Sequence, residues 1–403
     1  MTNAPGAAFL HYGHQSVDED DIAAVAAALR GDFLTTGPLV RRFEEAVAAR
    51  LGAQHVVACS SGTAALHLAA MALGLGPGDV AVVPSLTFLA TANAVRFTGA
   101  EVAFADVDSE TGMLTPATLR AALEGVAPAH AKAVLPVHLA GMVADLPAIA
   151  AVAGEFGAAV IEDACHALGA TYQARGGMVA VGSCAQSAMA CFSTHPVKAI
   201  TTGEGGLVAT QSAELAERAR RLRSHGIEHD PARWTSAAGL EDGKPAPWYY
   251  EMPEIGYNYR LTDIACALGL SQLGKLDRFL ARRAALAARY DRQLAPLAPH
   301  LRPPARPQGG SAWHLYAVRI DFAALKLARG EVMRRLRAQG IGTQVHYAPV
   351  HTQPYYRARY GARDLPGAET YYRRTLSLPL YPAMAEEDVD RVVAALAAAL
   401  KLR

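Results

Sequence analysis

Cysteine is scarce in this sequence, and none of its cysteines sits in a pairing or metal-binding motif. There are five cysteines among 403 residues, they are widely spaced, and no Cys-x-x-Cys pair occurs. Disulfides accumulate in oxidising compartments, and structural zinc sites need closely spaced thiolates or imidazoles. We therefore expect neither a disulfide framework nor a bound metal ion.

Long apolar runs and an excess of one charge are also lacking. No run approaches the roughly 20 residues of a transmembrane helix, and the N-terminus lacks the basic-then-apolar order of a signal peptide. The formal net charge is +1, so no strong field attracts nucleic acid or an anionic membrane. We expect a cytoplasmic protein whose ligand is a small molecule.

Lysine is rare as well, since only six of the 38 basic residues are lysines. One of them, Lys198, lies in the hydroxyl- and glycine-rich segment from Phe192 to Gly206, shortly after Pro196, and no helical charge pattern surrounds it. Partial desolvation lowers the pKa of a lysine and frees its amine to attack a carbonyl carbon. Lys198 is therefore a candidate for Schiff-base chemistry.

The length of 403 residues suits two domains. From residue 16 to about 290, helix-like and strand-like patterns alternate, as in an open α/β sheet built from βαβ units. The first predicted helices are 22–29 and 43–51. The predicted strands are 55–59, 80–84, 101–105, 133–137 and 159–161.

The C-terminal part has a different order of elements. A long arginine-rich helix from Leu273 through Tyr290 leads to a proline-rich stretch at 301–307. The elements expected after it are a strand at 315–320, a helix at 330–339, a strand at 343–346 and a helix at 386–400. This order predicts a large α/β domain over residues 1–275, with an N-terminal arm, and a smaller α+β domain over 276–403.

A hydroxyl-rich turn follows the first predicted strand. Ser61, Gly62 and Thr63 lie between this strand and an alanine-rich helix. The free N–H groups and the positive end of a helix at such a turn suit a phosphate. An ordinary Ser/Thr helix cap is the alternative interpretation, and the turn alone does not decide between the two.

Two acids and one aromatic residue follow other predicted strands. Glu162 and Asp163 end an apolar strand, at the edge where open α/β sheets hold ligands. A carboxylate there can face a cationic partner such as a pyridinium nitrogen, or it can cap the next helix. Phe88 follows another strand, where it can stack on a flat ring or belong to the core.

Two other enzyme classes are alternatives to a Schiff-base enzyme. His225, Glu228 and His229 have the spacing of an inverted zinc-peptidase motif. Gly226 and the Asp230-Pro231 pair disfavour the helix that such a motif needs. A nucleotide-dependent oxidoreductase is disfavoured because no Gly-x-Gly-x-x-Gly segment follows a strand.

Taken together, several segments resemble the sugar aminotransferases of the DegT/DnrJ/EryC1/StrS family, which use pyridoxal 5′-phosphate (PLP). The resemblance runs from about residue 10 to the C-terminus. It implies PLP-dependent aminotransferase fold type I, with a mostly parallel central sheet in the large domain. The segments that carry it are 60–63, 84–88, 162–166, 192–206 and 256–260.

The resemblance also implies roles for individual residues. Lys198 would hold PLP and carry the proton during transfer, Asp163 would face the pyridine nitrogen, and His166 would lie near the phenolic oxygen. Phe88 would stack on the ring. The implied phosphate contacts are Ser61, Gly62, Thr63, Ser193 and Asn258, the last from the neighbouring subunit of a homodimer.

Within the family, the chain is most similar to enzymes of pseudaminic acid biosynthesis. They transfer an amino group from L-glutamate to C4 of a UDP-linked 4-keto-6-deoxy-N-acetylhexosamine. Amination of a dTDP- or GDP-linked sugar, at C3 or C4, stays open as the alternative. Lys198 argues against the related dehydratases, which carry histidine there. His138, His346 and His351 are candidates for sugar contacts, although a histidine in such a place is more often structural. Arg260 is the candidate for the diphosphate. The aromatic segment 248–250 suits a nucleotide site and equally a protein interface.

Overall fold

A computed structural model describes residues 8–127, 130–306 and 310–402. The end of the proline-rich stretch, Pro307, therefore lies outside the described residues. Within the described ranges, none of the helices combines the length and the apolarity needed to cross a membrane.

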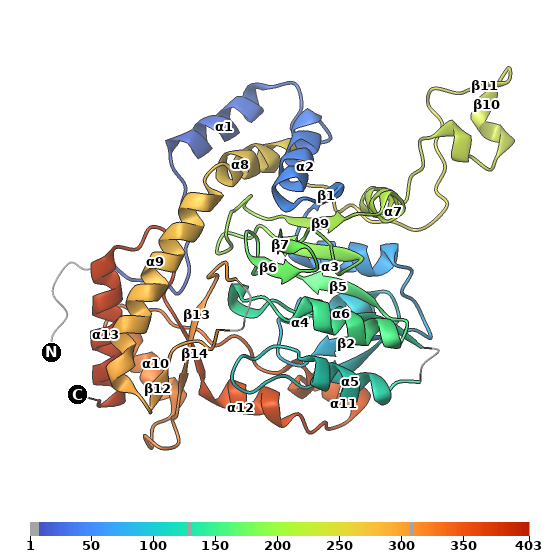
Figure 1. Ribbon diagram of the computed structural model, residues 1–403. Helices are drawn as coiled ribbons and strands as arrows, with labels where there is room; N and C mark the ends of the chain where they lie inside the picture. Colours follow the sequence, from blue (N-terminus) through green and yellow to red (C-terminus); the bar gives the residue numbers. More distant parts are fainter. Residues whose placement is uncertain (1–7, 128–129, 307–309, 403) are drawn as a thin grey trace.

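The large domain is built on a seven-stranded sheet (Figure 1). Only β9 runs antiparallel to both of its neighbours, and the remaining pairs are parallel. The prediction of an α/β fold with a mostly parallel sheet is confirmed. The strands, in spatial order, are β1 (His55–Cys59), β9 (Gly206–Thr210), β8 (Met189–Ser193), β5 (Ala159–Asp163), β4 (Ala131–Val134), β2 (Val80–Pro84) and β3 (Glu101–Ala105).

Helices cover both faces of this sheet. Successive strand residues point to opposite sides, and because both sets are apolar, each face has to be covered. In β1, Val56 and Ala58 belong to one hydrophobic cluster, while Val57 and Cys59 belong to the other. The first cluster is covered by α2 (Pro38–Leu51), α5 (Pro116–Glu124) and α6 (Leu146–Glu155). The second is covered by α3 (Gly62–Ala72), α4 (Leu89–Phe97) and α7 (Ala213–Arg223).

The C-terminal part contains a three-stranded antiparallel sheet in the order β12 (Leu301–Arg302), β13 (Tyr316–Ile320) and β14 (Thr375–Leu378). Helices α10 (Arg329–Ala338) and α13 (Glu386–Leu400) pack with it around a separate core. The strand expected at 343–346 is wrong. Only Gln344 pairs there, with Ser377 of β14, so the segment makes one bridge rather than a ladder.

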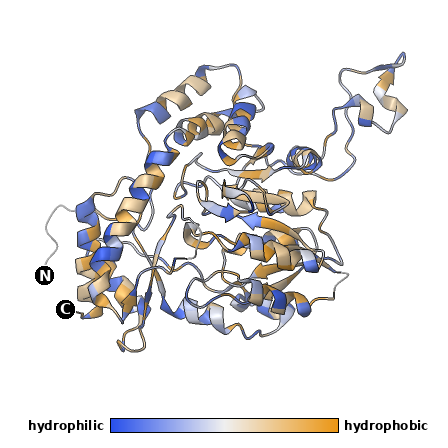
Figure 2. Cartoon of the chain, in the orientation of Figure 1, coloured by the Kyte–Doolittle hydropathy of each residue, from blue (hydrophilic) through white to orange (hydrophobic). Residues whose placement is uncertain are grey.

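The long helix α9 (Leu276–Leu294) joins the two parts. Leu276 belongs to the core of the large domain, whereas Leu286, Tyr290 and Leu294 belong to the C-terminal core. Hydrophilic and hydrophobic residues alternate along this helix (Figure 2). We propose that the domain boundary lies between residues 275 and 276. Helix α12 (Pro366–Arg374) belongs to the C-terminal part of the chain but packs on the core of the large domain.

The N-terminal segment is held by residues far along the chain. Helix α1 (Glu19–Arg30) packs on α8 (Asp263–Leu273). The Asp21 carboxylate accepts hydrogen bonds from the Ser271 hydroxyl at 2.6 Å and the Gln272 amide at 2.7 Å. These contacts tie the first helix to the end of the large domain.

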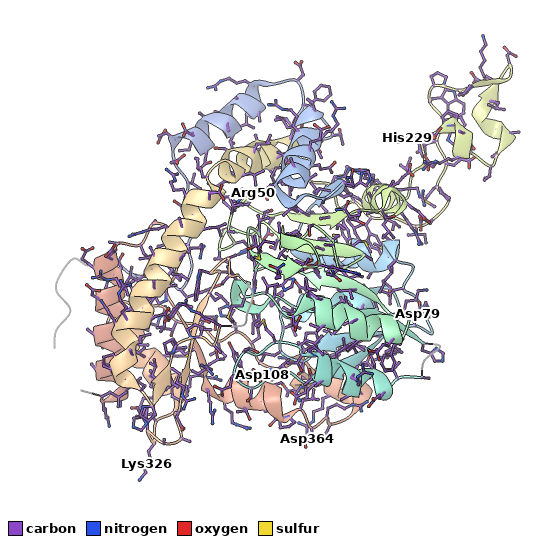
Figure 3. The ribbon with its side chains drawn as sticks, viewed as in Figure 1. Arg50, Asp79, Asp108, His229, Lys326 and Asp364 are labelled. Carbon is purple, nitrogen blue, oxygen red and sulfur yellow. The ribbon has the colours of Figure 1, made fainter. Side chains whose placement is uncertain are left out.

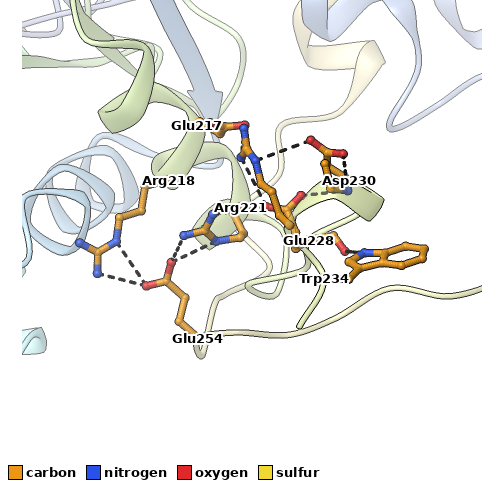
Figure 4. Close-up of polar contacts among 9 residues, drawn as sticks. Glu217, Arg218, Arg221, Glu228, Asp230, Trp234 and Glu254 are labelled. Atoms are coloured by element: carbon orange, nitrogen blue, oxygen red, sulfur yellow. Dashed lines mark hydrogen bonds and ion pairs between the residues drawn. The ribbon is translucent and has the colours of Figure 1, made fainter. Parts of the chain in front are cut away.

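Residues 229–250 form an arm that projects from the body and carries the short strands β10 (Leu240–Glu241) and β11 (Lys244–Pro245) (Figure 1). At its root, Glu228 and Glu251 pair through two main-chain hydrogen bonds of 2.7 and 3.1 Å. Nearby, Glu254 accepts from Arg218 at 3.1 Å and from Arg221 at 2.6 Å (Figure 4). The root is therefore anchored while the arm extends outward.

Candidate active site

A cavity of about 790 Å³ lies at the carboxyl ends of the parallel strands. Strand β1 ends before Ser60, β5 ends at Asp163, and β8 ends at Ser193, so three segments distant in sequence meet at one edge of the sheet. Nine residues singled out in the sequence line this cavity. They are Ser61, Gly62, Thr63, Phe88, Asp163, His166, Ser193, Lys198 and His346.

The turn before α3 is shaped for an anion. The Ser61 hydroxyl accepts from the N–H of Ala64 at 3.1 Å and caps the helix. The N–H groups of Gly62 and Thr63 belong to the first helical turn, where intrahelical acceptors do not exist. A side chain at position 62 would bring a Cβ within 2.8 Å of the Cβ of Ser193, so glycine lets this turn and β8 approach closely. The turn fits the phosphate of PLP.

Lys198 enters the same cavity from the connection between β8 and β9. The backbone N–H of Lys198 donates to the carbonyl of His195 at 2.9 Å, and this hydrogen bond fixes the backbone of the segment. Burial lowers the pKa of the Lys198 amine, and the nearby Cys165 and Asp163 only partly oppose this effect. A lowered pKa raises the fraction of neutral, nucleophilic amine near neutral pH.

The Asp163 carboxylate is buried and held in one orientation. Oδ2 accepts from the Thr91 hydroxyl at 2.7 Å, and Oδ1 accepts from the N–H of Cys165 at 3.2 Å. Because two donors fix its direction, the carboxylate can face one cationic atom in the cavity. This orientation suits a protonated pyridine nitrogen.

The hydrogen bonds of His166 fix its tautomer. The N–H of Ala140 donates to Nδ1 at 3.3 Å, so Nδ1 is an acceptor and the neutral ring carries its proton on Nε2. Nε2 lies 3.2 Å from the hydroxyl of Tyr347. Burial, helped by the Lys198 charge, holds the pKa of His166 well below its ordinary value, so the ring is neutral near pH 7.

Phe88 lies on the wall of the cavity and is 53% exposed. Its ring centroid is 5.7 Å from that of Tyr347. An exposed aromatic face beside Asp163 and Lys198 suits stacking on a flat heteroaromatic ring.

Other residues singled out in the sequence lie elsewhere. His138 is fully buried, its Nε2 3.0 Å from a Glu162 oxygen and its Nδ1 accepting from Ala144 at 3.2 Å. Since both ring nitrogens are engaged within the core, His138 does not line the cavity. His351 is buried likewise, 2.5 Å from the Ser85 hydroxyl.

Arg260, Asn258 and the arm are also apart from the cavity wall. Arg260 lines a second cavity of about 550 Å³ beside Glu44 and Arg223. Asn258 pairs through its backbone with Ser224. The aromatic segment 248–250 belongs to the projecting arm, with Trp248 exposed.

The zinc-peptidase alternative is wrong, because its residues do not lie on a helix. His225 and Gly226 both have left-handed backbone angles, with φ of 64° and 74°. Glu228 pairs with Arg221 at 3.5 Å (Figure 4), and His229 lies where the projection begins (Figure 3). Across the described ranges, no three His, Cys, Asp or Glu side chains are grouped to hold a metal ion.

The sequence did not reveal several residues that line the cavity or support it from behind. Thr91, in the first turn of α4, is fully buried and acts only through its hydrogen bond to Asp163. His314 and Tyr347 come from the C-terminal part and line the cavity beside His166. No local pattern marks these positions, because their partners lie far away along the chain.

The fold is similar to that of known aminotransferases. "Helicobacter pylori PseC, aminotransferase involved in the biosynthesis of pseudoaminic acid" superposes with a TM-score of 0.86 and 28% identity, covering 98% of this chain and 99% of that one. "Putative sugar aminotransferase Spr1654 from Streptococcus pneumoniae, PLP-form" gives 0.84 and 26%, with 99% of each chain covered. The fold and the site thus define a transaminase that uses PLP.

The sequence comparisons agree with the structural ones. Residues 15–397 match the model of the DegT/DnrJ/EryC1/StrS aminotransferase family, and the chain belongs to this family. The Bacillus subtilis (strain 168) "Spore coat polysaccharide biosynthesis protein SpsC" is 40% identical over 390 residues, which are 96% of this chain and 96% of that protein. The protein is a sugar aminotransferase.

Proposed function

We propose that the protein transfers an amino group from L-glutamate to C4 of a UDP-linked 4-keto-6-deoxy-N-acetylhexosamine. It acts as a cytoplasmic homodimer in a pathway of the pseudaminic acid type. The observation that carries the proposal is one cavity holding the buried Lys198, the oriented Asp163 and the turn at Gly62. The similarity to PseC over nearly the whole chain supports the choice of sugar.

Asp163 and Lys198 have different roles in the reaction. PLP, when bound, supplies the electron sink that lets an amino group leave a donor and join a carbonyl carbon. Asp163 holds a proton on the pyridine nitrogen and so maintains that sink. Nζ of Lys198 is both the nucleophile that holds the cofactor and the base that moves a proton next to it.

Further residues bind and orient the cofactor. The N–H groups of Gly62 and Thr63 and the hydroxyls of Ser61 and Ser193 would hold the phosphate. Phe88 would stack on the ring, and the neutral His166 with Tyr347 would lie at its phenolic side. Asn258, which is outside the cavity wall of its own chain, would reach the phosphate from the partner subunit.

A two-stage assay tests the proposal. The purified PLP-loaded enzyme is first treated with L-glutamate, and loss of the visible cofactor absorbance reports the donor stage. Keto-sugar nucleotides are then added one at a time, and the absorbance returns with the true acceptor. Lys198→Ala, the matched control, shows neither change. Return of the absorbance only with dTDP- or GDP-linked sugars would refute the UDP assignment.

The position of amination is tested in the same assay. A 4-keto and a 3-keto sugar carrying the same nucleotide are compared, and we expect only the 4-keto sugar to restore the absorbance. The similarity to SpsC keeps other polysaccharide sugars in the panel. A preference for the 3-keto sugar would move the reaction to C3.

A further inference from the structure

The segment 8–15, which leads to α1, is fastened to the C-terminal part of the chain. The N–H of Leu10 donates to the Gly340 carbonyl at 2.8 Å, and the N–H of Leu380 donates to the Tyr12 carbonyl at 3.1 Å. Both hydrogen bonds join main-chain groups, so they hold the backbone independently of the side chains. The backbone of Tyr12 is therefore in place before any ligand binds.

The side chain of Tyr12 belongs to the wall of the active-site cavity. Its ring centroid is 5.4 Å from that of His346, another residue of the wall. The pKa of Tyr347, also on the wall, is raised first by burial and then by its neighbours Asp163 and Tyr12. The Tyr12 hydroxyl therefore lies on the inner side of the cavity, within electrostatic reach of the Tyr347 hydroxyl.

The Tyr12 hydroxyl can be reached by a ligand. In the part of the chain that the structure describes, it has no hydrogen-bond partner, and it is not sealed from solvent. Burial raises the pKa of Tyr12, so the group is a neutral phenol near pH 7 that can both donate and accept a hydrogen bond. The cofactor contacts proposed above do not use it.

Two other neutral polar groups lie on the same stretch of the wall. Nδ1 of His346 is 2.8 Å from the Ser377 hydroxyl, whereas Nε2 has no partner among the described residues. Burial lowers the pKa of His346 to about 3, so the ring is neutral near pH 7. The side-chain carbonyl of Gln344 accepts from the N–H of Val345 at 2.9 Å, and its amide nitrogen is left to donate elsewhere.

We propose that Tyr12 binds the acceptor sugar through a hydrogen bond between its hydroxyl and a polar substituent of the sugar ring. This inference rests on the proposed function, in which the acceptor is a nucleotide-linked keto sugar. Neutral groups that donate and accept match the hydroxyl and amide groups of such a sugar, whereas the two carboxylates of the amino donor favour cationic partners. Gln344 and His346 lie beside Tyr12 and contact the same ring. Tyr12 therefore contributes to the choice of sugar.

Two inert probes measure this contact by titration calorimetry of the PLP-loaded enzyme. UDP-N-acetylglucosamine carries an N-acetylhexosamine but neither a keto group nor a free amine, so it cannot react, and UDP reports the nucleotide part alone. Tyr12→Phe is expected to weaken UDP-N-acetylglucosamine binding by about 3- to 10-fold, the usual effect of losing one neutral hydrogen bond, and to leave UDP binding unchanged. Equal affinities of the wild type and Tyr12→Phe for the sugar-linked probe would overturn the inference.

The donor stage and a second tyrosine provide the controls. With L-glutamate, the rate at which the visible cofactor absorbance is lost is expected to be the same in Tyr12→Phe and the wild type. A slower donor stage with unchanged binding of the sugar-linked probe would assign Tyr12 to the amino acid instead. Tyr381 lies near the same segment, with its ring centroid 5.9 Å from that of His14, but it does not line the cavity. Tyr381→Phe is therefore expected to bind both probes as the wild type does, and an equal loss in this variant would refute a specific role for Tyr12.

Failure of the proposed function gives a different result. A wild type that binds neither UDP nor UDP-N-acetylglucosamine would refute the UDP assignment, and dTDP with dTDP-glucose, or GDP with GDP-mannose, would then replace the two probes. Tyr12→Phe is still expected to weaken only the sugar-linked member of the pair. If the sugar added nothing to the affinity of the wild type in any pair, or if Tyr12→Phe weakened both members equally, Tyr12 would have no role in sugar binding.

Discussion

Thr91 makes the shorter of the two hydrogen bonds that orient the Asp163 carboxylate, and the cost of removing it can be calculated. The Thr91 hydroxyl lies 2.7 Å from Asp163 Oδ2 and also 2.7 Å from the Thr87 hydroxyl. One hydroxyl has a single proton, and the charged acceptor is favoured, so Thr91 donates to Asp163 and accepts from Thr87. Thr91→Val keeps the shape and removes both hydrogen bonds.

The free energy lost with the hydrogen bond to Asp163 can be expressed as a decrease in melting temperature. A buried hydrogen bond to a charged group contributes about 1.5–3 kcal/mol. At about 2 cal/mol/K per residue, a chain of this length unfolds with an entropy of roughly 0.85 kcal/mol/K, so the melting temperature of the apoenzyme should fall by about 2–4 °C. PLP affinity should fall as well, because the carboxylate is free to turn from the ring nitrogen.

Differential scanning calorimetry of the apoenzyme and a PLP titration measure the two effects. Thr91→Ser is the matched control, since it keeps the hydroxyl and loses only a methyl group. It should therefore bind PLP nearly as the wild type does. If Thr91→Val melted at the wild-type temperature and bound PLP with unchanged affinity, the role assigned to Thr91 would be refuted.

Three further changes have defined outcomes. Burial lowers the pKa of Lys198, so between the folded and unfolded pKa values the unfolded chain binds more protons and apoenzyme stability rises with pH. Lys198→Met should therefore raise the melting temperature most near pH 7, with a gain that shrinks toward pH 10, and a pH-independent gain would contradict this. Gly206→Ala would place a Cβ 2.1 Å from the Ser61 carbonyl oxygen, so it should abolish PLP binding in a titration. Normal affinity there would show that the turn has room to move. Glu254→Ala removes the acceptor of two arginines at the arm's root, so trypsin should cut residues 229–250 faster while the melting temperature changes little. Unchanged digestion would mean that other contacts hold the arm.

The central strands and the cavity residues could be predicted because both depend on short local patterns. Strands β1, β2 and β3 have the predicted bounds, since each is a short apolar run of a buried parallel strand. The carboxyl ends of such strands meet at one edge, which is why Asp163 and Ser61 share a cavity.

Long-range contacts account for what the sequence did not reveal. Strands β8 and β9 were not predicted, because the apolar runs on either side of Lys198 are short and lie beside a glycine-rich segment. His138 and His346 have the same residue type, and only the fold places one in the core and the other on the cavity.

The contact between α1 and α8 also has a consequence for folding during synthesis, because its two sides are translated far apart in time. Asp21 and Gln272 are 251 positions apart, and at 5–20 residues per second this interval takes roughly 10–50 s of translation. During that time the apolar side of α1 is exposed because α8 has not been made. For part of it, β1 also lacks its neighbour β9. Nascent chains should therefore engage chaperones early, and slower synthesis at low temperature should improve the recovered yield.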